Sequence, residues 1–566
     1  MLIIKENKKF IYVALIFIFL FQILDIALGT FKEKTDYYDN CETTFHEELT
    51  GYSKNSSTNN LIVKFEKFPI NPEIENIRCL NKIIAKSYDQ NTSKTIYQVG
   101  YSSNVYYLQF LLFILFVILN FRFFKFTYIE ILLIFDLFLY LQFIGLPVYI
   151  SITQILKLNI FLITLGIFIF NFRNILEEKK YDESVKKLNE SYILLFLLNI
   201  CIFIFFEHMK NFFYEGYYLH FSAWTVNYEG GINRRGLIGE MITTLYSGKN
   251  IKLIIVFLIS GIHSWLTFNI YSIFKLVKQN YLSVLIFLSP FYVLFVINDF
   301  RGGNMKEIMG FLSLSLLILF NLKKNRFYLV LSLIIYFVAV FSHNLNIFIM
   351  PAILFYVFYV SNLDQKIFVG ISYFSITVAN ILIYFSQIMQ NSFFNINEWC
   401  DKLIPKYNLY ESCFELRTGN LLDLRVNGGV FETISYTITN FNFMTFLNYF
   451  IVFLIINLYV FRTDYFKNKL KGILVLYISF LPLFILALDW GRWIHILFFT
   501  IFTIYLSDEN KIIDLKNYKT SFLIFIIPTF FVYNPHCCAT FSLKNIISYN
   551  LDSFHILDFF MKLYQF

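Results

Sequence analysis

A chain of 566 residues that is 57% hydrophobic and 21% aromatic, with 15% charged residues, cannot fold as an ordinary soluble globule. Its apolar surface exceeds what a single core of that size can bury. The net charge of +8 does not indicate nucleic-acid binding, because the excess lysines are spread over short loops between apolar segments. The composition therefore predicts an integral membrane protein that contacts membrane lipid and binds no nucleic acid.

Apolar windows of about 20 residues, the length that crosses a bilayer, recur along the whole chain. They predict an all-α fold, a polytopic integral membrane helical bundle of about 13–15 transmembrane helices that forms a single domain over residues 1–566. In chain order, the candidate spans lie near residues 10–29, 105–121, 127–147, 158–172, 191–206, 251–273, 281–298, 308–322, 327–342, 345–362, 367–388, 443–461, 472–488, 494–507 and 520–533.

The loops between these spans alternate in length and charge. With a cytoplasmic N-terminus, every loop on the inner side is basic, as the positive-inside rule requires. The three long segments, residues 30–104, 207–250 and 389–442, then lie on the extracytoplasmic side. This arrangement predicts a bacterial cytoplasmic (inner) membrane protein whose active face is periplasmic or extracellular.

Cysteine positions agree with that orientation. Cys41 and Cys79 share one predicted outer loop, and Cys400 and Cys413 share another. Because an oxidising compartment favours disulfides, each pair is predicted to form one; unpaired thiols are the alternative.

An arginine motif follows the fifth span. Two glycines, Gly230 and Gly231, permit a tight turn, and Arg234 and Arg235 follow them. Paired arginines held by such a turn match phosphate oxygens bidentately. Gly236 and Gly239 would let the chain pack closely before the next span. The alternative interpretation is that both arginines anchor the loop at the lipid headgroups.

Three more polar turns lie on the same predicted face, each at the end of a span. They contain Asp299 with Arg301, His343 with Asn344, and Asp489 with Arg492. Charged groups persist near a bilayer where they are paired or face a watery cavity. We therefore expect the turns to converge with the arginine motif in one outward-facing pocket. Taken singly, each Asp/Arg pair also fits a structural ion pair across a tight turn.

The pocket suits transfer chemistry that does not need ATP. No nucleotide-binding or zinc-binding motif occurs in the sequence, so no cofactor and no metal is expected. Arginines would stabilise the phosphate that leaves a polyprenyl-phosphate or diphosphate-linked sugar, and one acid or histidine would deprotonate the acceptor hydroxyl. The candidate bases, which remain unranked, are Glu229, Asp299 and His343.

With these motifs, above all the Gly-Gly-x-x-Arg-Arg-Gly stretch at 230–236, the chain resembles membrane proteins of bacterial surface-polysaccharide pathways. These are O-antigen polymerase-like proteins and GT-C-class glycosyltransferases. The resemblance implies a polyprenyl-linked glycan donor and a glycan acceptor as partners. It also implies an essential acid in the first outer loop, where Asp36 or Asp39 fits, although the second outer loop, near 148–157, lacks the acid expected there.

A transporter or flippase of a lipid-linked glycan is the alternative function. That class places charges near the bilayer midplane and often shows internal repeats. Here the motif charges gather at one predicted surface, and no repeat is evident in the sequence.

Overall fold

The computed structural model describes two compact units of the chain. The first contains three strands and the beginning of helix α5, and the second contains most of the described helices and the candidate site. The described residues are 75–79, 82–89, 94–101, 148–177, 181–214, 223–228, 236–246, 251–389, 398–402, 435, 437–439, 441–462, 469–486 and 488–508.

A three-stranded antiparallel sheet lies within the segment that the sequence predicts to be a polar outer loop. Strand β1 (Glu75–Cys79) pairs with β2 (Lys82–Asp89), which pairs with β3 (Lys94–Tyr101), in the order β1-β2-β3. The β2 sequence Lys-Ile-Ile-Ala-Lys-Ser-Tyr-Asp is too short and too polar to stand out against 20-residue apolar windows. Hydropathy averaged over 20 residues therefore does not reveal the strands.

From residue 148 onward every regular element that the structure describes is helical, which confirms the all-α expectation for that part of the chain. The elements are α5 (Val148–Leu176), α6 (Glu183–Tyr214), α8 (Leu237–Leu245), α9 (Ile251–Leu276), α10 (Tyr281–Phe287), α11 (Phe295–Asn298), α12 (Phe300–Gly303), α13 (Glu307–Lys323), α14 (Arg326–Ser342), the 3₁₀ helix η2 (Asn344–Ile349), α15 (Met350–Phe355), the π-helix η3 (Tyr356–Val360), α16 (Lys366–Met389), α21 (Phe443–Arg462), α23 (Leu470–Leu486) and α24 (Trp490–Ser507).

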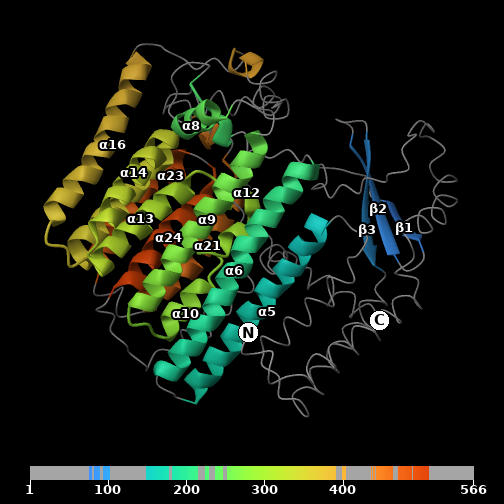
Figure 1. The fold of residues 1–566 in the computed structure, drawn as a ribbon, viewed down its shortest axis with the longest axis horizontal. Helices are drawn as coiled ribbons and strands as arrows, with labels where there is room; N and C mark the ends of the chain where they lie inside the picture. The colour runs from blue at the N-terminus through green and yellow to red at the C-terminus, as the bar shows by residue number, and fades with distance from the viewer. Residues whose placement is uncertain are drawn as a thin grey trace. The chain divides into compact units, whose positions relative to one another are not determined.

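Helices α13 and α24 form the interior of the helical unit. All residues of α24 are buried, and α13 packs against α14, α9 and α24. In Figure 1, α13 lies between α9 and α14, while α16 lies at the edge of these helices. The interior position of α13 and α24 buries Glu307 and Arg492, which lie in the first turns of these helices.

A two-residue turn makes α13 and α14 an antiparallel hairpin. Lys324 adopts the left-handed conformation (φ 54°), which ends α13. Asn325 then starts α14 by accepting a hydrogen bond from the backbone N–H of Phe327 at 3.0 Å. Because the hairpin is tight, the first residue of α13 and the last residue of α14 lie at the same end of the bundle.

Three described helical segments are long and apolar enough to cross a membrane: Glu183–Met209, Ile251–Leu276 and Lys366–Ile383. On α16, Ile367, Ile371 and Phe374 leave more than half of their surface exposed at helical spacing. An apolar stripe of this kind fits contact with lipid chains. Shorter apolar helices, such as Arg326–Ser342, accompany them.

The predicted continuous span 281–298 is wrong. The chain forms α10, leaves the helix at residues 288–294, and resumes as the short helices α11 and α12. Pro290 offers no N–H, and a proline disfavours helical geometry at the residue before it, Ser289. The irregular stretch is buried in the protein, where non-helical backbone is tolerated even at membrane depth.

The close packing expected at Gly236 and Gly239 is confirmed. A Cβ at Gly239 would lie 1.9 Å from the carbonyl oxygen of Val226, and a Cβ at Gly236 would lie 2.4 Å from the ring of Tyr228. Helix α8 therefore lies directly against the backbone of residues 225–226. Only a residue without a side chain permits this approach.

We predict that Gly239→Ala destabilises the protein by about 1–3 kcal/mol, because backbone must move to accept the methyl group. Gly261→Ala is the matched control, since a Cβ there meets nothing within 4 Å. Thermal unfolding in detergent is the measurement. Equal melting temperatures for the two variants would contradict the close contact at Gly239.

Candidate functional site

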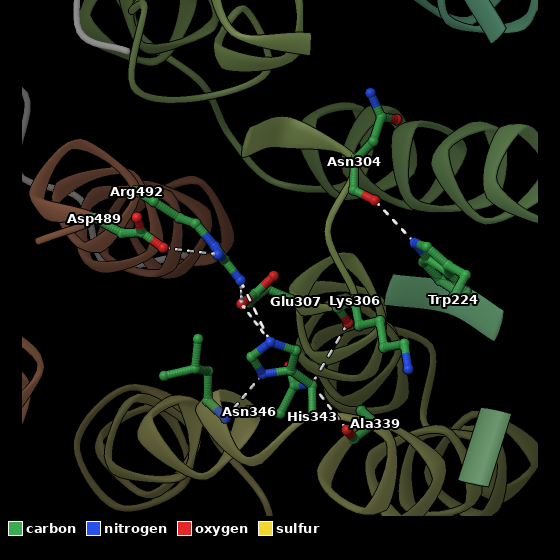
Figure 2. Close-up of polar contacts among 10 residues, drawn as sticks. Trp224, Asn304, Lys306, Glu307, Ala339, His343, Asn346, Asp489 and Arg492 are labelled. Carbon is green, nitrogen blue, oxygen red and sulfur yellow. Dashed lines mark hydrogen bonds and ion pairs between the residues drawn. The ribbon is translucent and has the colours of Figure 1, made fainter. Parts of the chain in front are cut away.

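Three helix ends bring together four polar side chains, which we call the Glu307–Arg492 cluster: Glu307, His343, Asp489 and Arg492. Glu307 begins α13, His343 follows α14, Asp489 precedes α24 and Arg492 lies in its first turn. Figure 2 shows the side chains of Arg492, Glu307 and His343 pointing toward one another. The structure thus joins two of the predicted turns through an acid that the sequence analysis left without a role.

Arg492 holds the cluster together. Its Nη2 donates to Glu307 Oε1, and its Nη1 donates to Asp489 Oδ2 at 3.2 Å. The guanidinium also lies 5.2 Å from the ring of Trp493, within cation–π range. Arg492 is 5% exposed and Glu307 3% exposed, so their charges interact with little screening by solvent.

The hydrogen bonds of His343 determine which ring nitrogen carries its proton. His343 Nδ1 accepts from the backbone N–H of Leu345 at 3.2 Å, so the neutral ring carries its proton on Nε2. Nε2 lies 3.8 Å from Glu307 Oε1 and 3.5 Å from Arg492 Nη2. Nε2 thus faces both the carboxylate and the guanidinium, at distances longer than a usual hydrogen bond. His343 stays a candidate base, as the sequence predicts, next to Glu307.

Two buried atoms of the cluster have no hydrogen-bond partner in the described part of the chain. They are Glu307 Oε2 and Arg492 Nε. Buried polar atoms are almost always paired, and an exception calls for an explanation such as a catalytic role. With a neutral His343, the four groups carry one positive and two negative charges and sum to −1. The cluster is therefore better suited to a hydroxyl group than to a phosphate.

Asp299 has a local structural role. Its Oδ1 accepts from the backbone N–H of Gly302 at 2.8 Å, capping the short helix α12. The residue lies in the broken, buried segment rather than in the short outer hairpin predicted from the sequence, because no continuous span precedes it. Both Asp299 and Arg492 are close enough to His495 to affect it electrostatically. Arg301 lies in α12, and its side chain is outside the described features.

Asn304 connects the segment before Glu307 to distant parts of the chain. Its side-chain oxygen lies 3.0 Å from His208 Nε2, and its backbone carbonyl accepts from the indole N–H of Trp224 at 3.0 Å. All three residues are fully buried. Nothing in the spacing of these residues pointed to this contact, since 96 and 80 positions separate the partners of Asn304 from it.

The residues that flank the arginine motif make one contact with each other's segment and one contact with the end of α14. Tyr228 donates its backbone N–H to Glu240 Oε2 at 3.1 Å, and Ile238 donates its backbone N–H to Ser342 Oγ at 3.0 Å. Burial, and then the charge of Glu240, raises the pKa of the Tyr228 hydroxyl, which stays a neutral phenol. Ser342 immediately precedes His343, so the end of the motif is tied beside the cluster.

Several predicted site residues lie outside the described residues. They are Asp36, Asp39, Glu229, Arg234 and Arg235. Their roles stay predictions. Of the others, His343, Asp489 and Arg492 come together, whereas Asp299 caps a helix nearby. Within the described residues, no group of three or more His, Cys, Asp or Glu side chains could hold a metal ion.

A second tertiary contact joins two of the predicted outer segments. Trp399 donates its indole N–H to Asn227 Oδ1 at 2.9 Å, and Trp399 is fully buried. The next residue, Cys400, is also fully buried. The predicted Cys400–Cys413 and Cys41–Cys79 pairings stay predictions, because Cys413 and Cys41 are not described.

Comparison with known proteins leaves the site to be interpreted from its own geometry. No protein-family model, no curated protein and no solved structure matches the chain.

The buried ion pair makes a stability prediction. Arg492→Met should cost about 3–5 kcal/mol, because Glu307 would be left buried without its counter-charge. Adding Glu307→Gln should recover part of that loss, since the double variant contains neither charge. The measurement is a double-mutant cycle of unfolding in detergent, with the exposed Arg326→Met as control. Additive losses from the two substitutions would contradict the pairing.

Proposed function

We propose that this chain is a polytopic inner-membrane protein that transfers a glycosyl group, or polymerises a glycan, from a polyprenyl-phosphate or diphosphate-linked sugar. The reaction takes place on the extracytoplasmic face. One observation carries the proposal: a buried carboxylate, Glu307, is held through one oxygen by Arg492 while its second oxygen has no hydrogen-bond partner among the described residues.

Glu307 is the catalytic base in this proposal. Its Oε2 accepts the proton of the acceptor hydroxyl while the hydroxyl oxygen attacks the anomeric carbon. The bond from that carbon to the phosphate oxygen breaks, and its electron pair leaves with the phosphate. Arg492 donates to Oε1 and thereby orients Oε2, while His343 Nε2 lies 3.8 Å from the same oxygen. A base positioned in this way typically contributes about 10²–10⁴ in rate.

The leaving phosphate needs positive charge that the cluster lacks. Arg234 and Arg235 are the proposed source, as the sequence motif predicts. Support comes from the residues that flank them, because Ile238 is hydrogen-bonded to Ser342, next to His343. Arginine is suited to this role, since its planar guanidinium forks onto two phosphate oxygens. In this arrangement the acidic cluster binds the acceptor hydroxyl, and the arginines bind the phosphate of the donor.

Charge at the two ends of the bundle supports the orientation. Glu307 and Lys323 are the first and last residues of α13, so about 24 Å of helix separates them. The turn at the far end exposes Lys323, Lys324 and Arg326. Basic turns face the cytoplasm in most membrane proteins. The cluster would then face outward, in a single domain of about 13–15 spans.

A lipid-linked glycan transporter or flippase is the second candidate function. The broken segment from α10 to α12 favours it, because transporters often build their sites from discontinuous helices. His263, halfway along the candidate span Ile251–Leu276, is also buried. The cluster itself lies at helix ends rather than at mid-helix, and for this reason transfer is the preferred function.

We predict that Glu307→Gln lowers glycan formation by about 10²–10⁴, because the amide cannot take up the proton. Asp299→Asn should retain most activity, since the amide oxygen can still accept from Gly302 and cap α12. Product is measured in cells at matched membrane abundance, with the exposed Glu183→Gln as control. Transfer predicts that lipid-linked precursor accumulates on the outer leaflet, whereas a flippase defect leaves it on the inner leaflet. Normal product from Glu307→Gln would end the proposal.

Orientation can be checked separately from activity. A cysteine at Asn325, in the basic turn, should react with a membrane-impermeant maleimide only after lysis. A cysteine at Glu398, beside the Trp399 contact, should react in intact cells. The unsubstituted protein reports the background from native cysteines. The reverse pattern would place the cluster at the cytoplasmic face and exclude the proposed reaction site.

A further inference from the structure

Asn346 is a buried amide that bridges two of the helix ends at the cluster. It lies in η2 and is fully buried. Its Nδ2 donates to the carbonyl of Ala339 at 2.9 Å and reaches the carbonyl of Lys306 at 3.4 Å (Figure 2). One side chain therefore connects the last turn of α14 to the residue that immediately precedes Glu307.

The same residue is tied to His343 through the backbone. Asn346 donates its N–H to the His343 carbonyl at 3.0 Å, while His343 donates its own N–H to the Ala339 carbonyl at 2.9 Å. Ala339 is thus a shared acceptor for the two residues. These contacts limit movement of the turn in which Leu345 donates to His343 Nδ1.

Gly310 accommodates this bridge. It lies one turn into α13, and a Cβ there would approach Asn346 Oδ1 to 2.4 Å and Ile349 Cδ1 to 2.3 Å. The absence of a side chain at Gly310 lets η2 approach α13 closely enough for the amide to reach Lys306. Two independent features, a buried amide and a glycine, therefore set the separation of these two elements.

We infer that Asn346 is a positioning residue: it holds His343 against Glu307 and keeps the His343 ring proton on Nε2. The inference rests on the proposed function only where it concerns catalysis. The geometric part, the ring tautomer and the 3.8 Å approach of Nε2 to Glu307 Oε1, depends on the fold alone. A bridge that merely joined two helices would stabilise the protein without affecting the ring of His343.

Histidine nitrogen chemical shifts test this difference directly. The full chain is labelled with ¹⁵N-histidine and reconstituted in lipid, and the His343 signal is identified by its loss in His343→Gln. The wild type should show a protonated Nε2 and an unprotonated Nδ1. Asn346→Ala should produce a mixture of tautomers. Gly310→Ala should do the same, since it displaces the amide without removing it.

The matched control is Asn269→Ala. Asn269 is also a buried amide between two helices, and it donates to Ser315 Oγ at 3.0 Å. Ser315 lies on α13, eight residues after Glu307. This variant should leave the His343 signal unchanged even where it lowers stability. An unchanged His343 signal in both Asn346→Ala and Gly310→Ala would overturn the inference.

Activity adds a second readout. If Glu307 is the base, Asn346→Ala should lower glycan formation on the order of 10-fold to 100-fold at matched abundance, as small displacements of reacting groups do. Combined with His343→Gln, the loss should be less than additive, because Asn346 acts through His343. A tautomer change together with full activity in Glu307→Gln would reject the proposed function and leave the positioning role standing. Fully additive losses would overturn the positioning role in catalysis.

Discussion

The ion pair between Arg492 and Glu307 is the interaction on which the rest of the site depends. It joins α24 to α13, the two interior helices, at a point where both side chains are almost fully removed from solvent. Burying two charges costs several kcal/mol each unless further hydrogen bonds compensate. Asp489 supplies one such contact to the guanidinium. The remaining oxygen of Glu307 and the Nε of Arg492 lack such a contact in the described structure.

The backbone around this pair is irregular for a physical reason. Between α10 and α13 the chain forms only short helices. Asp299 accepts from the backbone N–H of Gly302, and the backbone carbonyl of Asn304 accepts from Trp224. Buried irregular backbone persists only where other groups satisfy it. The same contacts attach Trp224, and with it the start of the arginine motif, to the approach to Glu307. The contacts that satisfy the irregular backbone therefore also position the chain beside Glu307.

Periodicity and composition alone predicted much of the helical part of the chain. Long apolar runs such as Ile251–Leu276 have few other solutions in a membrane, because every backbone polar group must be paired internally. The close packing at Gly239 was also predicted, since a glycine lets the backbone of two segments approach each other. The sheet at residues 75–101 was not predicted, because its strands are short and mixed in polarity. Pro290 interrupts the helix between α10 and α11. Hydropathy averaged over a window does not show this interruption, because the residues on both sides are apolar.

Hydropathy and residue spacing were enough to predict that the chain is apolar enough for a membrane and that polar residues occur at the ends of its helices. They also placed His343, Asp489 and Arg492 at such ends. These are local properties, which spacing and hydropathy express directly. Tertiary packing alone makes Glu307 the shared neighbour of Arg492 and His343 and shows that Asp299 caps α12. The partners Glu307 and Arg492 are 185 positions apart, so their contact depends on how α13 and α24 pack. No local pattern records that packing.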